Sequence, residues 1–232
     1  MTTIYRETFD TGPGGWTVGK NKVDGEFHKN IFGHRGSGPP LDWSPTGGRS
    51  SPGYAYSESP WYFDDNHGQF MWFHLALRVP TTVEIGIPGV DLRGATFRVV
   101  LRGRDLRTRG TRLYFWIQGR RGNPPGYYVG DPLYNWALTS RPIERPLHAT
   151  DWTEESFSLV DDEAQWSQMG LINGGLGRKI RVLQSTSMAD GSLTKILGGL
   201  HWNFGFVLGP LDPNDLPTGR IELDEVTITA AE

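Results

Sequence analysis

The stretch Arg112-Leu-Tyr-Phe-Trp-Ile-Gln118 alternates purely apolar residues with polar or amphipathic ones. Successive side chains of a β-strand point to opposite faces of the sheet, so this alternation predicts a strand with two different faces. One face is apolar and belongs to a core; it carries Leu113, Phe115 and Ile117. The other face combines aromatic and amide groups; it carries Tyr114, Trp116 and Gln118.

Two other stretches alternate in the same way. In residues 70–79 the apolar set is separated from a face that carries Trp72 and His74, and in residues 201–208 it is separated from a face that carries His201 and Asn203. A solvent-exposed face without a function more often carries Lys, Glu, Thr and Ser. The three strands therefore share an unusual second face.

Similar short runs, bounded by Gly, Pro, Asn and Asp, recur along the chain, whereas helical periodicity is scarce. This pattern predicts an all-β fold with antiparallel strands packed as a β-sandwich in a single domain, 1–232. An amphipathic helix is expected at 189–200 and a second helical turn at 162–169. Long loops are expected at 33–59, 119–132 and 209–219, and strands at 4–9, 16–18, 71–79, 96–102, 112–118, 135–139, 153–158, 202–208 and 220–229.

Composition excludes several classes of protein. The 28 aromatic residues (9 Trp, 8 Tyr and 11 Phe) provide enough apolar surface for a core, so a disordered chain is excluded. A net charge of −3 predicts neither nucleic acid nor membrane as a partner. The absence of cysteine excludes disulfides and thiolate metal sites. Without a signal-peptide pattern the chain is expected to be cytoplasmic as written, or secreted if the sequence was trimmed.

Both ends of the chain carry motifs of a known group of folds. The opening Glu7-Thr-Phe-Asp-Thr-Gly-Pro-Gly-Gly-Trp16 and the closing Gly219-Arg-Ile-Glu-Leu-Asp-Glu-Val-Thr-Ile228 resemble the first and last strands of carbohydrate-binding jelly rolls of the galactose-binding-domain-like superfamily. Residues 42–54 and 192–197 are similar to the laminin domain-IV variant. The resemblance implies an antiparallel β-sandwich jelly roll with one or two short helices, and terminal strands that lie side by side.

The same resemblance implies a structural calcium ion (Ca²⁺) near the two terminal strands. Asp10 and Asp224 occupy the positions of its usual acidic ligands. Calcium requires six to eight oxygen ligands, so Asp24, Glu26 and backbone carbonyl groups would complete the shell. Surface carboxylates that bind no metal are the alternative interpretation.

The aromatic and polar face favours carbohydrate as the ligand. Flat rings stack on the apolar face of a sugar, while amide and imidazole groups bind its hydroxyls. The expected platforms are Trp72, Tyr114 and Trp116, and the expected hydrogen-bonding residues are His74, Gln118, His201 and Asn203. Alternatively, the long loops cover these rings as a second small core.

An enzyme of the same fold is the second hypothesis, either a small-molecule cyclase or isomerase of a natural-product pathway or a glycan lyase or hydrolase. Asp64 and Asp65 follow three aromatic residues, and together with His74 they are the candidate acid–base groups. An ordinary turn also contains such carboxylates. A third hypothesis is an assembly module whose aromatic face contacts another protein.

Overall fold

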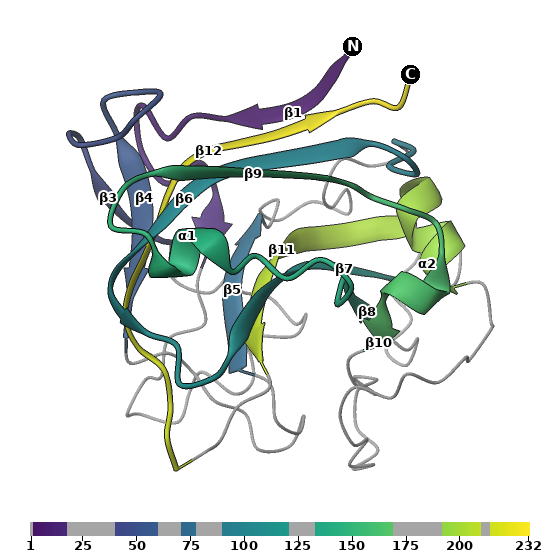
Figure 1. Cartoon of the computed structure of the whole chain (residues 1–232). Coiled ribbons are helices and arrows are strands. Elements are labelled where there is room, and N and C mark those ends of the chain that lie inside the picture. The colour runs from purple at the N-terminus through teal and green to yellow at the C-terminus, as the bar shows by residue number, and fades with distance from the viewer. Residues whose placement is uncertain are drawn as a thin grey trace.

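The computed structural model describes residues 2–17, 40–59, 71–77, 90–120, 133–168, 192–209 and 214–232. In this part of the chain two antiparallel β-sheets pack face to face around one core (Figure 1). The predicted all-β antiparallel sandwich is confirmed. Its apolar faces meet in the interior because each sheet must bury the apolar half of its alternating strands.

The first sheet, here called sheet A, has the strand order β3-β4-β12-β6-β9, and β1 also pairs with β12. β4 pairs with residues 220–223 of β12 and β1 with residues 226–229, so both share one edge of β12 while β6 lines the other. The strands are β1 (Thr3–Glu7), β3 (Asp42–Ser44), β4 (Tyr54–Glu58), β6 (Thr96–Arg107), β9 (Thr153–Ser158) and β12 (Thr218–Thr229).

The second sheet, sheet B, has the order β10-β8-β7-β11-β5-β2. Its strands are β2 (Trp16–Thr17), β5 (Met71–Leu77), β7 (Arg112–Arg120), β8 (Leu133–Ala137), β10 (Ser167–Gln168) and β11 (His201–Gly209). The orders β4-β12-β6-β9 and β5-β11-β7-β8 are those of a jelly roll, in which the chain crosses repeatedly between two four-stranded sheets. The first and last strands are neighbours, as the resemblance implied.

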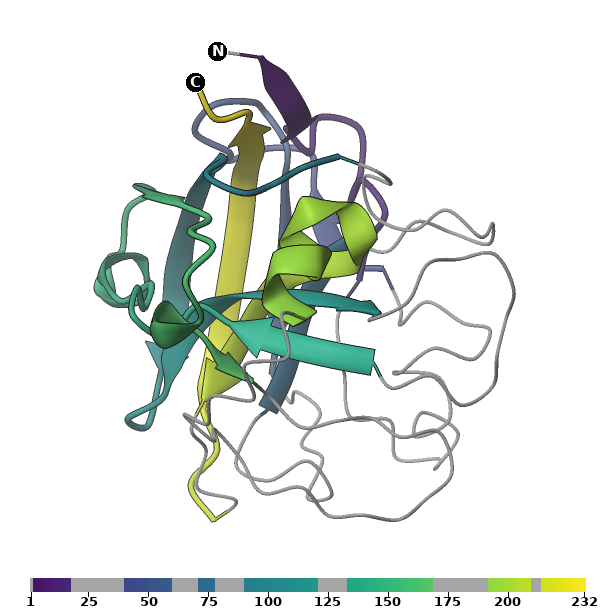
Figure 2. The ribbon, with the colours of Figure 1, turned by 90° about the vertical axis from the view of Figure 1, so that its right-hand side faces the viewer.

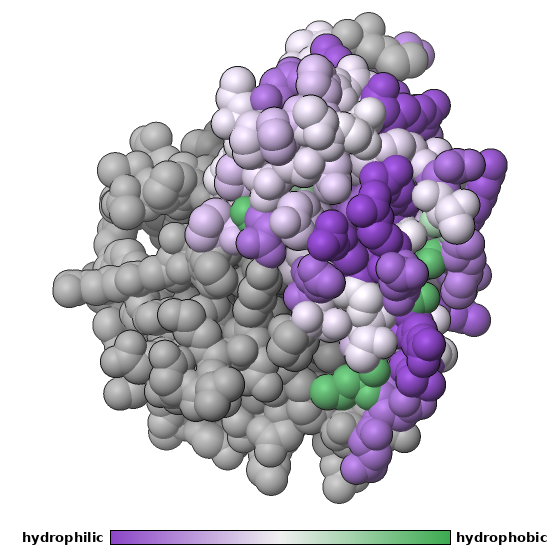
Figure 3. All heavy atoms as spheres, turned by 90° about the vertical axis from the view of Figure 1, so that its left-hand side faces the viewer, coloured by the Kyte–Doolittle hydropathy of each residue, from purple (hydrophilic) through white to green (hydrophobic). Residues whose placement is uncertain are grey.

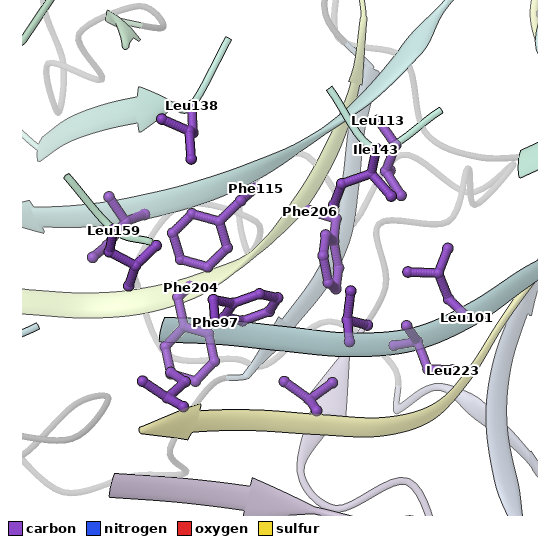
Figure 4. Close-up of a cluster of buried hydrophobic side chains, with 14 of the residues drawn as sticks. Phe97, Leu101, Leu113, Phe115, Leu138, Ile143, Leu159, Phe204, Phe206 and Leu223 are labelled. Atoms are coloured by element: carbon purple, nitrogen blue, oxygen red, sulfur yellow. The ribbon is translucent and has the colours of Figure 1, made fainter. Parts of the chain in front are cut away.

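The core lies between the sheets and is rich in aromatic rings (Figure 4). Phe97 of β6 contacts Phe115 of β7 with ring centroids 4.7 Å apart, so the two sheets interlock through their phenylalanines. Trp16 stacks on Phe206, and its indole Nε1 donates a hydrogen bond to the Tyr5 hydroxyl at 2.9 Å. Because a buried N–H without a partner is costly, this bond lets the indole join the core.

The helix predicted at 189–200 is observed in its described part, residues 192–200. It consists of α2 (Ser192–Lys195) and the π-helical turn η4 (Ile196–Leu200), and Gly199 leaves helical geometry at φ 122°. Leu193, Ile196 and Leu197 are fully buried, so the segment closes one end of the sandwich (Figure 2). None of the described helices is long and apolar enough to cross a membrane.

Two further helical turns lie beside β9. The turn predicted at 162–169 is the 3₁₀ helix η3 (Glu163–Gln165), and the side chain of Asp162 accepts the backbone N–H of Ala164. The short helix α1 (Arg145–His148) was not predicted.

The predicted loop 33–59 is wrong in its second half, which contains β3 and β4. β4 is one of the eight strands of the jelly roll and pairs with β12 over four residues. The other predicted strands are observed; 153–158 has the predicted bounds, and β6 extends five residues further than predicted, to Arg107.

Candidate functional site

The face of sheet B that points away from sheet A contains the row of residues predicted from 112–118. Partners in an antiparallel pair lie on the same face, so the register fixes the neighbours of each residue. Trp116 lies between Ala137 of β8 and Gly205 of β11. The next row, two residues along β7, places Gln118 between Asn135 and Asn203. Three amide residues therefore align across three adjacent strands.

The small neighbours of Trp116 have a direct physical consequence. An indole is wider than the spacing of two strands, about 4.8 Å, and Ala and Gly leave lateral room for it over the sheet. Trp116 is only 1% exposed and Tyr114 6%, although both belong to the outer face. In this structure neither ring is an open platform.

Trp72 and His74 lie on β5, between the paired positions Met71 and Leu75. The register shifts in this stretch of β5, since Leu208 of β11 pairs with Met71 and Phe206 with Leu75. A second shift separates His201 from Asn203, and His201 pairs with Gly119. His201 thus stands outside the row of Gln118 and Asn203.

Tyr114 lies beside an ion pair at the start of β7. The Arg112 guanidinium contacts the Glu144 carboxylate, with Nε and Oε1 2.8 Å apart, and both side chains are exposed. Burial raises the pKa of Tyr114, while the neighbouring Arg112 acts in the opposite direction. The outer face therefore changes from exposed and charged at Arg112 to buried and aromatic at Trp116.

Asp224, predicted as a metal ligand, is buried in β12 and holds a loop. Its Oδ1 accepts the backbone N–H of Arg49 at 2.9 Å, and its Oδ2 accepts that of Ser50 at 2.7 Å. Gly48 packs so closely on this carboxylate that a Cβ at Gly48 would collide with it. Both oxygens of Asp224 thus face N–H donors, which is the arrangement of a loop anchor.

Asp10, the other predicted calcium ligand, is exposed, and its carboxylate accepts the Thr8 hydroxyl at 2.7 Å. Within the described ranges, no three His, Asp or Glu residues come together in a way that could hold a metal ion. Asp10 and Asp224 each accept hydrogen bonds from protein donors. Asp24 and Glu26 lie outside the described residues, so the calcium site stays a prediction.

Asp64 and Asp65 also lie outside the described residues. Sequence reasoning missed Asn135, which joins the amide row through the pairing of β8 with β7. The predicted strand 135–139 already carried a sign of this position, because Asn135 and Ala137 alternate with Trp136 and therefore share one face. The sequence did not show the neighbours of Asn135 on the adjacent strand, because these depend on the register between strands.

Comparisons of the chain with protein-family models, with curated proteins and with solved structures found no match.

Proposed function

We propose that the protein binds a carbohydrate on the outer face of sheet B. The observation that carries this proposal is the alignment of Asn135, Gln118 and Asn203 in one row beside the row that contains Trp116. Neighbouring strands are about 4.8 Å apart, so three aligned residues span roughly 10 Å. Amides both donate and accept hydrogen bonds, which suits the many hydroxyl groups of a sugar.

Because Trp116 is buried, we assign it a supporting role in this proposal and not a direct contact with the sugar. An enclosed indole supports the face from within the structure, and the amide row next to it makes the polar contacts with the sugar. Loss of Trp116 should therefore affect folding as well as binding. Loss of an amide should affect binding alone, because an amide on an outer face contributes little to the core.

The test is a thermal-shift titration of the full chain with soluble glucan, xylan, galactan and starch. A ligand that binds only the folded state stabilises it by about 2.7 kcal/mol at a concentration of 100 Kd. For a chain of this size the expected rise in Tm is roughly 5–10 °C. Gln118→Ala and Asn203→Ala should each weaken the response and keep the Tm of the free protein.

Asn214→Ala is the matched control, because Asn214 is an exposed amide residue in the segment before β12 of the other sheet. It should leave the response unchanged. If no polysaccharide raises the Tm, or if the three variants respond alike, the carbohydrate proposal fails.

A small-molecule enzyme is the second candidate, and the burial of Tyr114 and Trp116 is the observation that favours it. Enclosed rings suit an apolar substrate better than an extended glycan, and they stabilise a developing positive charge. The candidate acid–base groups remain Asp64, Asp65 and His74. A Tm rise with apolar amines but with no polysaccharide would favour this function.

A further inference from the structure

The outer face of sheet A carries a second group of polar and aromatic residues, on the opposite side of the sandwich from Trp116. In the register, Arg102 of β6 and Tyr56 of β4 flank Glu222 of β12, and Arg104 lies opposite Arg220. Trp152, just before β9, lies against Arg102. We call Arg102, Arg104, Arg220, Tyr56 and Trp152 the arginine–aromatic patch. Figure 3 shows the side of the molecule with β3 and β4, where strongly hydrophilic residues form a band.

The three guanidinium groups of the patch lie around one buried carboxylate. The Glu222 carboxylate is fully buried and forms ion pairs with Arg102, with Arg104 (Nε to Oε1, 3.2 Å) and with Arg220 (Nη1 to Oε1, 3.6 Å). Arg220 also binds Glu58, with Nη2 and Oε2 2.9 Å apart. The Glu222 Oε2 accepts a hydrogen bond from Arg102 Nε, whereas its Oε1 has no hydrogen-bond partner among the described residues and lies only within ion-pair distance of Arg104 and Arg220. Arg102 is therefore the arginine that the carboxylate holds most firmly.

Two of these arginines also stack on aromatic rings. The Arg102 guanidinium lies 4.2 Å from the centroid of the Trp152 ring, and that of Arg220 lies 4.3 Å from the Tyr56 ring. Trp152 and Tyr56 are half-buried, and a guanidinium covers one face of each ring. The patch therefore combines cations with half-buried aromatic residues.

The arginines have more donors than their protein partners use. Each guanidinium has five N–H groups. Within the described part of the chain, Arg102 and Arg104 contact carboxylates only through Nε, which leaves the Nη1 and Nη2 groups of both without a protein acceptor. Among the described residues, these ion pairs join three guanidiniums to two carboxylates, and Asp42, which pairs with Tyr56, adds a third carboxylate to the same face of the sheet.

A neighbouring ion-pair group on the same face provides the contrast. There Arg6 and Arg98 pair with Glu225 and Glu154, so two guanidiniums meet two carboxylates. None of the described cation–π contacts involves this group. Guanidiniums stacked on aromatic rings are therefore a property of the arginine–aromatic patch and not of the whole face.

We propose that the arginine–aromatic patch binds a polysaccharide that contains uronic acid. The planar fork of Arg104, whose side chain is 48% exposed, matches a carboxylate, which it can bind through two parallel hydrogen bonds. Arg102, 14% exposed, adds its positive charge from within the patch. The rings of Trp152 and Tyr56 provide the apolar contact that a sugar ring requires and a simple carboxylate does not. This site is separate from the amide row of sheet B and does not depend on it.

The experiment measures binding of the full chain to polygalacturonate by isothermal titration calorimetry, with poly-L-glutamate as a second polyanion. We expect binding to polygalacturonate that weakens as NaCl is raised from 50 to 500 mM, because partly exposed charges are screened. Arg104→Gln should weaken it about tenfold through loss of one charged hydrogen-bonding group. Arg104 is 48% exposed, so this variant should keep the fold.

Arg6→Gln is the matched control. Arg6 is also an exposed arginine, 60% accessible, whose Nε binds a buried glutamate of β12, at 3.1 Å. It should leave binding to polygalacturonate unchanged. The proposal is overturned if wild type does not bind polygalacturonate, if Arg6→Gln weakens binding as much as Arg104→Gln, or if poly-L-glutamate binds equally well.

Discussion

Asp224 in β12 accepts the backbone N–H of Ser50, a residue 174 positions earlier in the chain, at 2.7 Å. The last strand thereby holds the loop that leads into β4. Asn in place of Asp224 has only one carbonyl oxygen, so one of the two N–H donors would face an NH₂ group. We expect Asp224→Asn to lower the free energy of unfolding by about 2–3 kcal/mol, measured by urea unfolding. Asp10→Asn, at an exposed position, should change it by less than about 0.5 kcal/mol.

The same variant tests the role of calcium at Asp224. Because its described partners are N–H groups, the cost of Asp224→Asn should be equal in calcium and in chelator. Urea unfolding of wild type and variant in both buffers measures this. A cost that grows in calcium would instead make Asp224 a metal ligand, as the sequence predicted.

Trp116 should contribute to stability in proportion to its burial. Replacing a buried Trp with Ala removes its packing and leaves a cavity, at a cost of about 3–5 kcal/mol. Trp116→Phe keeps a ring and should cost clearly less. Urea unfolding followed by circular dichroism compares the two. Equal and negligible losses for both would show that the indole does not support the fold.

Glu225 should make the protein sensitive to acid. Burial alone would raise the pKa of its carboxyl, but the Arg98 guanidinium, the Thr227 hydroxyl and Arg6 outweigh burial and lower it. A lowered pKa in the folded state adds stability above pH 4.5, its ordinary pKa, and this is lost as the pH falls through the lowered value. Glu225→Gln should flatten the fall of Tm between pH 5 and 3.

Tyr5 should make the protein sensitive to high pH. Burial raises the pKa of its hydroxyl well above the usual 10.0, with the hydrogen bond from Trp16 acting against it. A raised pKa in the folded state gives stability that is complete below pH 10 and is lost as the pH rises further. Tyr5→Phe leaves the buried Trp16 N–H unpaired and should cost about 1–3 kcal/mol at pH 7.

The difference between Tyr5→Phe and wild type should shrink when Tm is measured at pH 10.5, since only wild type loses the tyrosine contribution there. A difference that stays constant from pH 7 to 10.5 would contradict the raised pKa of Tyr5.

Most strands were predictable because the two faces of one strand are encoded within that strand. In β7 the alternation of Leu113, Phe115 and Ile117 with larger amphipathic residues was sufficient to predict the strand and its two faces. β4 lacked this signal: its inward positions are Ala55 and Ser57, both fully buried but too small to mark a core face in the sequence. Flanking Gly, Pro and Ser residues then favoured a loop.

The candidate site was predictable only in its composition. Gln118 and Asn203 were expected on one face, but their alignment with Asn135 depends on pairing between strands distant in sequence. The shift between His201 and Asn203 likewise arises from pairing and has no signature in the residues themselves. The burial of Trp116 is a property of the folded chain, which alternation along β7 could not distinguish from exposure.

The central position of β12 has a consequence for synthesis in the cell. β12 is the last of the described strands to leave the ribosome, yet β1, β4 and β6 all pair with it, in one case across 162 residues. Until then β4 and β6 have a free edge where β12 belongs, open to pairing with another chain. Such long-range pairing folds slowly. The yield of folded protein should therefore depend on how quickly this strand is delivered, and chaperones that shield nascent edges should raise it.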